Sequence, residues 1–564
     1  MAENKIKRKN NSCPVIVNEK FIFVGPMTEN NIFCIECYKE RMKEINLYDY
    51  YFGYRSSSVT EIEEDLVEYL KEKITNNYDE AFLYEINRVT LEIEMKSTFK
   101  RSDCFSCSDL IFNIRTKKIN SEFDPNNLRQ VKFNKVIEKI DSHKKLIYGS
   151  KASIVNSISR SGDSYGTPMV QTEVLYKDVS MLSYGRTSEF GQSKYISILE
   201  SLERYATAFP YKKKKVQFVE GESDLIDITL SEVINQSNYL NSNNYNENIP
   251  LNYEEVISLH NNKNVLIPEQ LIYFNSHSVS GEERYIYESS NGSAIGSTMA
   301  EASLHAMLEL FERDAFLATW YGRIPPVRIS TSNLNSKKVQ LNIDSLKRKN
   351  IIVHIFNISL ELEIPIIWVL LEKINPKYNE MAFYTAAAAA FTIEEAIERA
   401  LIEATTAITV FTNVFNKEEY LKRKTYLLKD PSKVSKLEDH LLLYSNQEMK
   451  SKFKFALETT EVKTMAEMKN SYVKFEGDFN DIVDEMEKVI LSISNKAYKA
   501  VTPNLNLLLI GFTNVKYIVP GMLTMTFGHQ NRRVVIERIK KAIKLKKKGS
   551  YDMEWIKNNP HPFP

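Results

Sequence analysis

Glutamates at helical spacing are the side chains of this sequence best suited to hold a metal ion. The pattern Glu-x-x-Glu-Arg occurs twice, at residues 200–204 and 309–313. Residues three or four apart share one face of an α-helix, so each pair of carboxylates can act on one ligand. Together with Glu301, which precedes the second pair, the candidates for metal or nucleotide binding are Glu200, Glu203, Glu301, Glu309 and Glu312.

A helix is expected over residues 298–320, and its glutamates fall on one side. At 3.6 residues per turn, Glu301, Glu309 and Glu312 lie within about 80° of one another around the helix axis. The segment is otherwise rich in Ala, Leu, Met and Phe, where unpaired carboxylates are costly. Cations are therefore expected, and Mg²⁺ held between carboxylates and substrate phosphates would supply them. Five glutamates on two helices would hold more than one ion.

Each glutamate taken alone has a simpler explanation. Glu301 stands three residues after Thr298, which is the spacing of a capping box. Glu309 and Arg313 are four residues apart and suit a surface ion pair. The repeat of the whole Glu-x-x-Glu-Arg step nevertheless favours a shared metal site. Because no P-loop and no Gly-x-Gly-x-x-Gly turn is present, a nucleotide would have to be bound in another way.

Four of the five cysteines form two Cys-x-x-Cys pairs, which is the arrangement of a structural zinc site. The pairs are Cys34 with Cys37 and Cys104 with Cys107. Four thiolates complete a tetrahedral Zn²⁺ site and leave no open position for catalysis. The long gap between the pairs exceeds the spacing of a compact zinc ribbon, so the metal would join two remote loops of one fold. The alternative is four reduced cysteines in turns.

Composition and charge exclude several classes of protein. Of the 564 residues, 43% are hydrophobic and 26% are charged, which is ordinary for a globular protein. The 74 basic and 73 acidic side chains leave a net charge of +1, so no global field attracts nucleic acid or an anionic membrane. The basic run 540–548 is the only support for a zinc-dependent nucleic-acid binder, and a solvated helix face explains it better. The sequence shows no secretory signal and no membrane-spanning run, so we expect a cytoplasmic protein.

The pattern along the chain predicts a mixed α/β (α+β) protein of two domains. Residues 1–145 are expected to form a small α/β domain with the zinc site, and residues 146–564 a large second domain. Amphipathic spacing predicts helices, and alternation or a short apolar run predicts strands. The helices are expected at 59–75, 192–207, 298–320 and 392–412, the strands at 82–98 and 364–371, and a surface insertion at 232–263.

Three segments resemble the signature regions of the YcaO family of ATP-dependent peptide-modifying enzymes. They are residues 191–205, 291–315 and 392–405, in this order, and Val519-Pro-Gly521 resembles a late strand of that family. The resemblance covers about residues 150–564. It implies that ATP and Mg²⁺ are held by helix-borne glutamates rather than by a P-loop.

Carried over to this sequence, the resemblance assigns roles to the glutamates described above. Glu200, Glu203, Glu301, Glu309 and Glu312 become magnesium or nucleotide ligands, and Arg313 a phosphate contact. Two positions depart from the family pattern. Ile196 stands where the family usually has serine, and Ser297 where it usually has asparagine.

The last five residues, Pro-His-Pro-Phe-Pro, resemble the terminal signature of azoline-forming YcaO enzymes. Alternating prolines impose an extended polyproline II rod, which would deliver the carboxylate of Pro564 to a fixed point. Pro564 is therefore the catalytic candidate, either orienting the peptide or moving a proton. The alternative is a frayed, proline-rich end of the chain.

The resemblance implies an ATP-dependent cyclodehydratase. Such an enzyme would convert Cys, or else Ser and Thr, of a ribosomally synthesised precursor peptide to thiazoline or oxazoline rings, in thiopeptide or bacteriocin biosynthesis. Two alternatives are a YcaO enzyme that makes thioamides or amidines and a non-catalytic scaffold that docks the precursor for another enzyme.

The amino-terminal part resembles the zinc-bearing half of a ubiquitin-activating-enzyme-like domain that accompanies such cyclodehydratases. The resemblance rests on Gly25-Pro26 and on the two cysteine pairs. Residues 1–145 are too few for the complete domain with its leader-peptide reader. The implied partners are the precursor peptide, a separate leader-binding protein, a downstream azoline dehydrogenase and a second copy of the chain.

Overall fold

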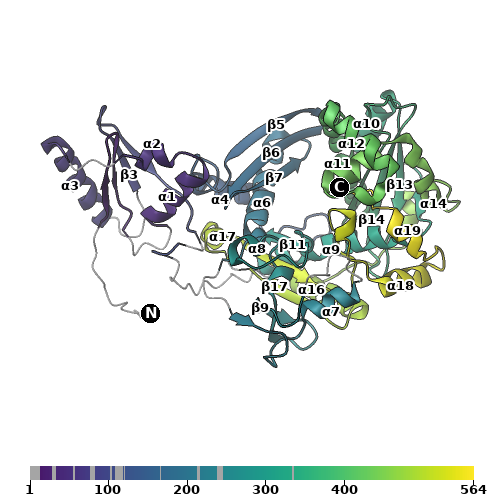
Figure 1. Cartoon of the computed structure of the whole chain (residues 1–564). Coiled ribbons are helices and arrows are strands. Elements are labelled where there is room, and N and C mark those ends of the chain that lie inside the picture. Colours follow the sequence, from purple (N-terminus) through teal and green to yellow (C-terminus); the bar gives the residue numbers. More distant parts are fainter. Residues whose placement is uncertain are drawn as a thin grey trace.

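The computed structural model has the mixed α+β architecture that the sequence predicts (Figure 1). It describes residues 13–27, 33–54, 58–76, 83–101, 104–107, 119, 121–164, 167–211, 216–237, 245–332, 334, 336–502 and 504–563. The amino-terminal sheet lies at one end of the molecule, and three further sheets make up the rest (Figure 1). Within the described ranges, none of the helices has the length and apolar character needed to span a membrane.

The amino-terminal sheet is antiparallel, has the order β1-β2-β3-β4 and carries helices on both faces. Successive side chains of a strand point to opposite faces. Alternate side chains of β2 are therefore buried in two different hydrophobic cores. Phe21 and Phe23 pack with the helix that contains Cys37 and with the helix after it, whereas Ile22 and Val24 pack with the helix predicted at 59–75. The elements are β1 (Val15–Val17), β2 (Phe21–Val24), β3 (Leu83–Asn87), β4 (Ile93–Lys96), α1 (Ile35–Glu44), α2 (Tyr48–Phe52) and α3 (Glu61–Asn76).

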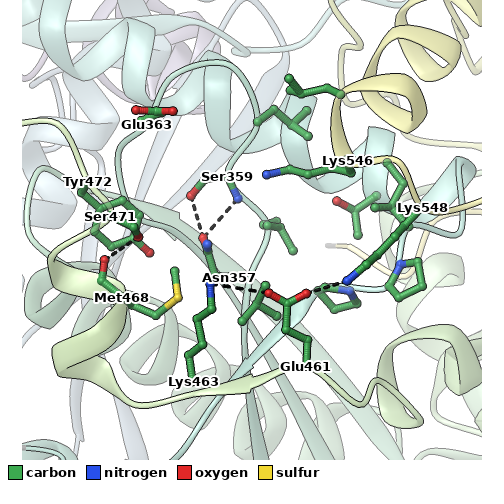
Figure 2. A pocket seen from close by; sticks show the side chains of 18 residues that line it. Asn357, Ser359, Glu363, Glu461, Lys463, Met468, Ser471, Tyr472, Lys546 and Lys548 are labelled. Atoms are coloured by element: carbon green, nitrogen blue, oxygen red, sulfur yellow. Dashed lines mark hydrogen bonds and ion pairs between the residues drawn. The ribbon is translucent and has the colours of Figure 1, made fainter.

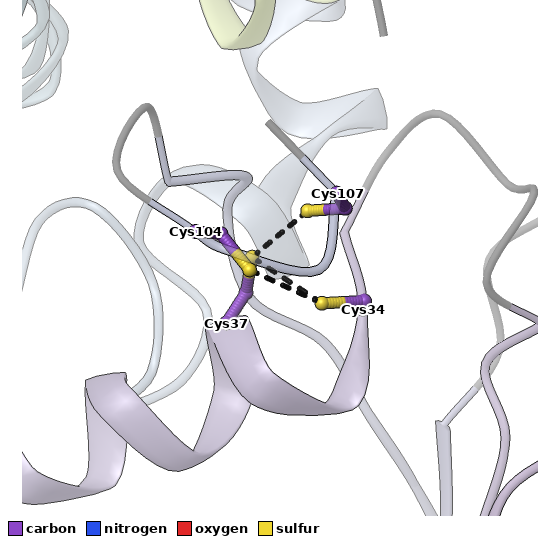
Figure 3. Close-up of side chains that lie close together, drawn as sticks. All are labelled: Cys34, Cys37, Cys104 and Cys107. Carbon is purple, nitrogen blue, oxygen red and sulfur yellow. Dashed lines mark hydrogen bonds between the residues drawn. The ribbon is translucent and has the colours of Figure 1, made fainter. Parts of the chain in front are cut away.

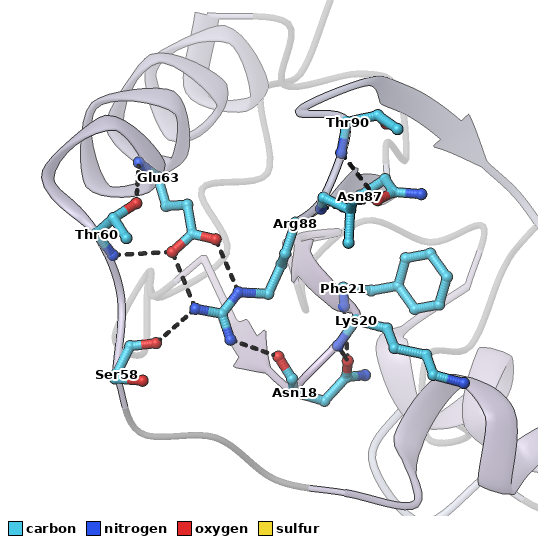
Figure 4. Close-up of polar contacts among 10 residues, drawn as sticks. Asn18, Lys20, Phe21, Ser58, Thr60, Glu63, Asn87, Arg88 and Thr90 are labelled. Carbon is cyan, nitrogen blue, oxygen red and sulfur yellow. Dashed lines mark hydrogen bonds and ion pairs between the residues drawn. The ribbon is translucent and has the colours of Figure 1, made fainter.

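A buried ion pair fixes the start of α3 to this sheet (Figure 4). Nε and Nη2 of Arg88 donate to the two carboxylate oxygens of Glu63 at 2.8 and 3.0 Å. This contact lowers the pKa of Glu63 to about 2. Arg88 also donates to the carbonyl oxygens of Asn18 and Ser58, so one side chain holds the β1–β2 turn, the end of β3 and the segment that leads into α3.

A three-stranded antiparallel sheet of order β5-β6-β7 supports α6, the helix predicted at 192–207. Gly185 of β7 allows this packing, because a Cβ there would lie 1.7 Å from the Ser193 carbonyl oxygen of α6. Val136 and Ile140 of α4 share the core of α6, and the division of the chain at residue 145 stays a prediction. The bounds are β5 (Ser157–Ser164), β6 (Thr167–Tyr176), β7 (Val179–Arg186), α4 (Phe133–Ser142), α5 (Lys144–Ile147) and α6 (Phe190–Ala208).

The two larger sheets share one central helix, α9 (Met299–Tyr321). It packs against β11 and β18 of one sheet and against β14 and β15 of the other, which explains its apolar composition. The first sheet has the order β10-β9-β17-β18-β11, with β8 paired to β9, and the second has the order β15-β14-β13-β12-β16. Their strands are β8 (Val216–Phe218), β9 (Leu251–Ser258), β10 (Lys263–Pro268), β11 (Ser293–Gly296), β12 (Val327–Ile329), β13 (Ile351–Asn357), β14 (Ile366–Lys373), β15 (Phe383–Ala389), β16 (Val462–Lys463), β17 (Tyr498–Val501) and β18 (Thr513–Ile518).

The third predicted long helix, α11 (Ile393–Val414), packs on β14 and β15 and also contacts the three-stranded sheet. It therefore joins α6 and α9 in the middle of the molecule. The remaining helices surround the two larger sheets. They are α7 (Leu230–Gln236), η2 (Glu269–Leu271), α8 (His277–Ser280), α10 (Lys337–Arg348), α12 (Glu418–Lys429), η3 (Pro431–Lys433), α13 (Leu437–Tyr444), η4 (Gln447–Phe453), α14 (Lys454–Leu457), α15 (Met465–Lys469), α16 (Phe479–Ile493), α17 (Leu505–Ile510), η5 (His529–Asn531), α18 (Ile536–Lys546) and α19 (Met553–Asn558).

One prediction about the fold is wrong. Residues 232–263 were expected to be a surface insertion, but β9 and the start of β10 belong to the six-stranded sheet. Leu251, Tyr253 and Val256 of β9 are buried in its core. The Asn-rich and Ser-rich composition of the segment hid this strand, because most of those polar residues precede it; residues 238–244 lie outside the described ranges.

Candidate functional site

Helices α6 and α9 bring four of the five predicted glutamates near one another. Glu200 and Glu203 come from α6, and Glu309 and Glu312 come from α9. The backbone N–H of Ile295 in β11 donates to Glu203 at 3.3 Å, so α6 lies against the strand that leads into α9. The sequence predicts a site shared by these two helices, and the structure places Glu203 of α6 near Glu309 of α9.

Burial raises the pKa of three of these carboxyl groups. The pKa of Glu203 is raised well above its ordinary value by burial and then by the neighbouring carboxylates Glu309 and Glu200. Burial also raises the pKa of Glu309 and raises that of Glu312 to about 7. The side chains of Glu309 and Glu312 are still 26% and 12% exposed. Crowded acids that a solute can reach are suited to bind cations.

Arg313 lies between Glu309 and Glu312 and is within ion-pair distance of both, but it forms a hydrogen bond with neither carboxylate. Its guanidinium nitrogens are 3.6 Å from Glu309 and 3.8 Å from Glu312, which is beyond hydrogen-bond distance. Nε of Arg313 is buried and has no hydrogen-bond partner among the described residues. Glu200, in contrast, accepts hydrogen bonds from Arg204 at 2.8 Å and from the Tyr184 N–H at 2.9 Å. Arg313 therefore retains donors for an oxyanion.

Glu301 occupies a different environment at the amino end of α9. It is fully buried, lies 3.5 Å from Arg129 and accepts the N–H of Gln130 at 3.2 Å. The Thr298 hydroxyl accepts the N–H of Glu301, so half of the expected capping box is present. Burial raises the pKa of Glu301, and Arg129 opposes this shift. Its assignment as a ligand stays a prediction.

Two charged residues of α11 belong to the same region, and the sequence analysis did not single them out. Arg399 and Glu403 both act on the pKa of Glu312, the first lowering it and the second raising it. Together with burial, Arg399 also contributes to lowering the pKa of His305, which lies on α9 between Glu301 and Glu309. Their spacing of four residues on one helix face was the available signal, but it is common on surface helices and carried no weight alone.

The residues present fit a magnesium–nucleotide site. The donor set consists of carboxylates, which are hard oxygen ligands, and the hydroxyl of Ser297 at the start of α9 is buried without a partner among the described residues. The oxygens of the glutamates do not gather as closely as metal ligands within one all-protein site, since the cysteines are the only described group with three or more ligand atoms within 4.8 Å. Phosphate oxygens would have to complete the coordination.

The carboxyl-terminal tail is anchored beside this site, although Pro564 lies outside the described residues. The carbonyl oxygens of residues 559–562 each accept a hydrogen bond from a different side chain. Pro560 and Pro562 have no backbone N–H. These hydrogen bonds therefore satisfy most of the backbone polar groups of the tail. The donors are Trp320 at 3.3 Å, Tyr444 at 2.5 Å, His440 at 2.7 Å and Thr385 at 3.1 Å.

The four predicted zinc ligands converge in the amino-terminal domain (Figure 3). The sulfur atoms of Cys34 and Cys104 are 3.4 Å apart, as are those of Cys37 and Cys107, and all four lie within 4.8 Å of one another. A tetrahedral zinc with Zn–S bonds of about 2.3 Å separates its sulfurs by about 3.8 Å. The thiols are buried and form no disulfide, so the geometry fits a tetrathiolate site.

A cavity of about 340 Å³ lies at the other end of α9, away from the glutamates (Figure 2). Thr319 near the end of α9 lines it, together with the β13–β14 loop and the end of α18. Its lysines Lys463 and Lys548 lie 3.5 and 2.5 Å from Glu461. The charges of this cavity largely compensate one another, and it is separate from the candidate site.

Helix-borne carboxylates, an arginine whose Nε has no hydrogen-bond partner among the described residues, and an anchored tail are the features expected of a protein that holds a metal-chelated polyphosphate without a P-loop. A family model described as "YcaO cyclodehydratase", ATP- and Mg²⁺-binding, matches residues 184–523. The chain therefore belongs to the YcaO cyclodehydratases, a family of ATP-dependent enzymes. A comparison with curated protein sequences finds no significant match.

Several solved structures share the fold. A heterocyclase in complex with substrate and cofactor aligns with a TM-score of 0.68 and 16% identity, over 98% of this chain and 77% of the other. The Methanopyrus kandleri YcaO structure bound with AMPPCP and Mg²⁺ aligns with a TM-score of 0.50 and 15% identity, over 70% and 92%. The Escherichia coli microcin synthetase McbBCD complex with pro-MccB17 bound aligns with a TM-score of 0.51 and 14% identity, over 72% and 96%.

Proposed function

We propose that this enzyme converts cysteine residues of a ribosomally synthesised precursor peptide to thiazolines, with serine and threonine as secondary substrates that give oxazolines. The biosynthesis of a thiopeptide or bacteriocin is the proposed context. The observation that carries the proposal is the group formed by Glu203, Glu309, Glu312 and Arg313, with the tail anchored next to it.

The proposed reaction consumes one ATP for each ring. The sulfur of a substrate cysteine bonds to the carbonyl carbon of the preceding amide and loses its proton. The amide oxygen then takes the γ-phosphoryl group of ATP, and ADP leaves. Cleavage of the C–O bond releases phosphate, and loss of the amide nitrogen proton completes the C=N bond. The peptide loses the mass of one water for each ring.

The protein's part in this reaction is positioning and charge neutralisation, as phosphoryl transfer generally requires. Mg²⁺ held by the glutamates of α6 and α9 would neutralise charge on the phosphates. Arg313 has an unpartnered buried Nε and would donate to a phosphate oxygen. We assign Pro564 the role of orienting the peptide or accepting a proton, because the carbonyl oxygens of residues 559–562 are held in place.

We further propose a structural role for the amino-terminal domain. Residues 1–145 would be a zinc-bearing, ubiquitin-activating-enzyme-like domain and residues 146–564 the catalytic domain. Zinc on four thiolates requires reduced cysteines, which suits the cytoplasm. A separate protein would bind the leader of the precursor, and an azoline dehydrogenase would act afterwards. The similar microcin synthetase is a multi-component complex with its precursor bound, which supports the proposed partners.

The test is the mass of a cysteine-rich precursor after incubation with this chain, a leader-binding partner, ATP and Mg²⁺. We expect the peptide to lose the mass of one water for each modified cysteine, and one phosphate to be released for each ring formed. A gain of sulfur in place of oxygen would instead identify a thioamide-forming enzyme. ATP hydrolysis that does not depend on the peptide, with no change in peptide mass, would contradict the proposal.

A further inference from the structure

Another cavity, of about 500 Å³, lies beside the carboxyl-terminal tail and is lined by basic side chains. It is open to solvent on one side and is lined by residues of α12, η3, η5 and α19. None of the lining residues that the structure describes is acidic, in contrast to the cavity of Figure 2, where Glu461 lies within ion-pair distance of two lysines. The titratable side chains that line it are Arg423, Tyr426, Lys433, His529, Arg532 and Lys557.

Arg532 is a buried cation without a carboxylate partner among the residues that the structure describes. It is 9% exposed, and Nη1 donates to the His529 carbonyl oxygen at 2.6 Å. No acidic side chain of the described ranges lies within ion-pair distance, and burial lowers its pKa. A buried charge without a counter-charge is costly. The other buried arginines that the structure describes, Arg41, Arg101, Arg533 and Arg538, each have a carboxylate partner.

The neighbouring cations leave an excess of positive charge in this cavity. Nε and Nη2 of Arg423 donate to the two carboxylate oxygens of Asp439 at 2.9 and 2.6 Å, and the guanidinium lies over the Tyr426 ring. The charge of Arg423 is therefore already balanced, and its side chain is fixed in position. Lys433 is exposed and has no ion-pair partner in the described part of the chain. Lys557 lies 3.3 Å from the exposed Glu554, a pair that contributes little in water. A multiply charged anion would balance Arg532 and Lys433 together.

We propose that this cavity binds a phosphate-bearing small molecule. A guanidinium and an ammonium that approach from different elements suit the several oxygens of a phosphate group. A volume of about 500 Å³ lies within the range of small-molecule sites. The ligand could be inorganic phosphate or the phosphate of a nucleotide, and both share this chemistry.

The position of the cavity couples it to the tail. Nε2 of His529, which lines the cavity, donates to the carbonyl oxygen of Lys557 at 2.6 Å. Lys557 lies in α19, and the anchored carbonyl oxygens begin two residues later at Asn559. A ligand that contacts both Arg532 and Lys557 would hold η5 against α19 and so hold the start of the tail. This coupling between the ligand and the tail rests on the proposed function, because it predicts that the ligand changes the rate of ring formation.

The binding test uses the full-length enzyme with the glutamate site filled by Mg²⁺ and a non-hydrolysable ATP analogue. Inorganic phosphate, AMP and citrate are titrated in turn by calorimetry. We expect phosphate or AMP to bind, and Arg532→Gln to weaken that binding by about tenfold or more. Lys433→Gln, at an exposed position, should weaken it by about threefold, and the matched control Lys548→Gln in the cavity of Figure 2 should leave it unchanged.

The proposal remains testable even if one variant does not fold. If Arg532→Gln fails to fold, the exposed pair Lys433→Gln and Lys557→Gln together must still weaken binding. No binding of phosphate or AMP to the wild type, equal binding to all variants, or tighter binding of citrate than of phosphate and AMP would overturn it. Phosphate binding that survives without any ring formation would contradict only the proposed function, because calorimetry does not depend on turnover.

Discussion

The guanidinium of Arg313 lies 4.5 Å from the centre of the Phe563 ring. This contact joins the glutamate-bearing helix α9 to the penultimate residue of the chain. Phe563 is 1% exposed and also packs against Phe316, one turn further along α9. The aromatic residue of the tail thus has a packing role beside the acidic site, and this role can be separated from the chemistry of the terminal carboxylate.

Changes to the last two residues of the tail should have different effects on ring formation and on stability. Removing Pro564 alone should leave the free energy of unfolding unchanged and greatly reduce ring formation, because the carboxylate moves to a new position. Phe563→Ala should lower the free energy of unfolding by about 3–5 kcal/mol, since it empties a buried aromatic site. Urea unfolding and peptide mass measure the two effects. Normal ring formation without Pro564 would remove that residue from the mechanism.

Replacing a crowded acid should stabilise the enzyme and inactivate it. Glu309→Gln removes a carboxylate whose pKa is raised by burial, so the ligand-free protein should gain about 1–2 kcal/mol. Calorimetry with Mg²⁺ and ATP should show binding weakened by about tenfold or more. Glu485→Gln, on the exposed face of α16, is the matched control and should change neither quantity. Wild-type nucleotide binding by Glu309→Gln would exclude Glu309 as a ligand.

The ligand-free enzyme should lose stability as the pH rises through about 7. The pKa of Glu312 is raised from 4.5 to about 7 in the folded state, so its stabilising contribution is full below about 4.5 and lost above about 7. The change amounts to roughly 3 kcal/mol. Urea unfolding at pH 5, 6, 7 and 8 should show it as a growing advantage of Glu312→Gln over the wild type. A constant difference between the two proteins would contradict the assigned shift.

The zinc site predicts a loss of metal with a local loss of structure. Cys104→Ser together with Cys107→Ser should release one zinc for each chain, and elemental analysis measures it. Because thiolate binding contributes directly to folding, hydrogen exchange should speed up in β1–β4 and α1–α3 and remain slow in α9. Cys13→Ser is the control, since Cys13 lies outside the cluster, and it should retain the metal. Unchanged zinc content in the double variant would reject the site.

Local spacing was sufficient to predict much of this protein. The three long helices occur where the apolar period placed them, at α6, α9 and α11, because an amphipathic pattern is a local property. The four cysteines converge as their pairing suggested, since two Cys-x-x-Cys turns have one arrangement that joins them. The strand predicted at 364–371 is β14, which is buried within its sheet. The strand β9 was missed, because its polar flanks resemble a loop.

The amino-acid sequence by itself determined the carboxylate pairs on one helix face, the two Cys-x-x-Cys pairs and the proline-rich end, because each depends on residues close together in the chain. Only the tertiary structure decided which of these groups meet. It brought Arg399 and Glu403 to Glu312, paired Glu301 with Arg129, and left Arg532 without a carboxylate from the described ranges. The physical reason is that charges act through space, whereas periodicity reports only the face of an element and not the partner that the fold places opposite it.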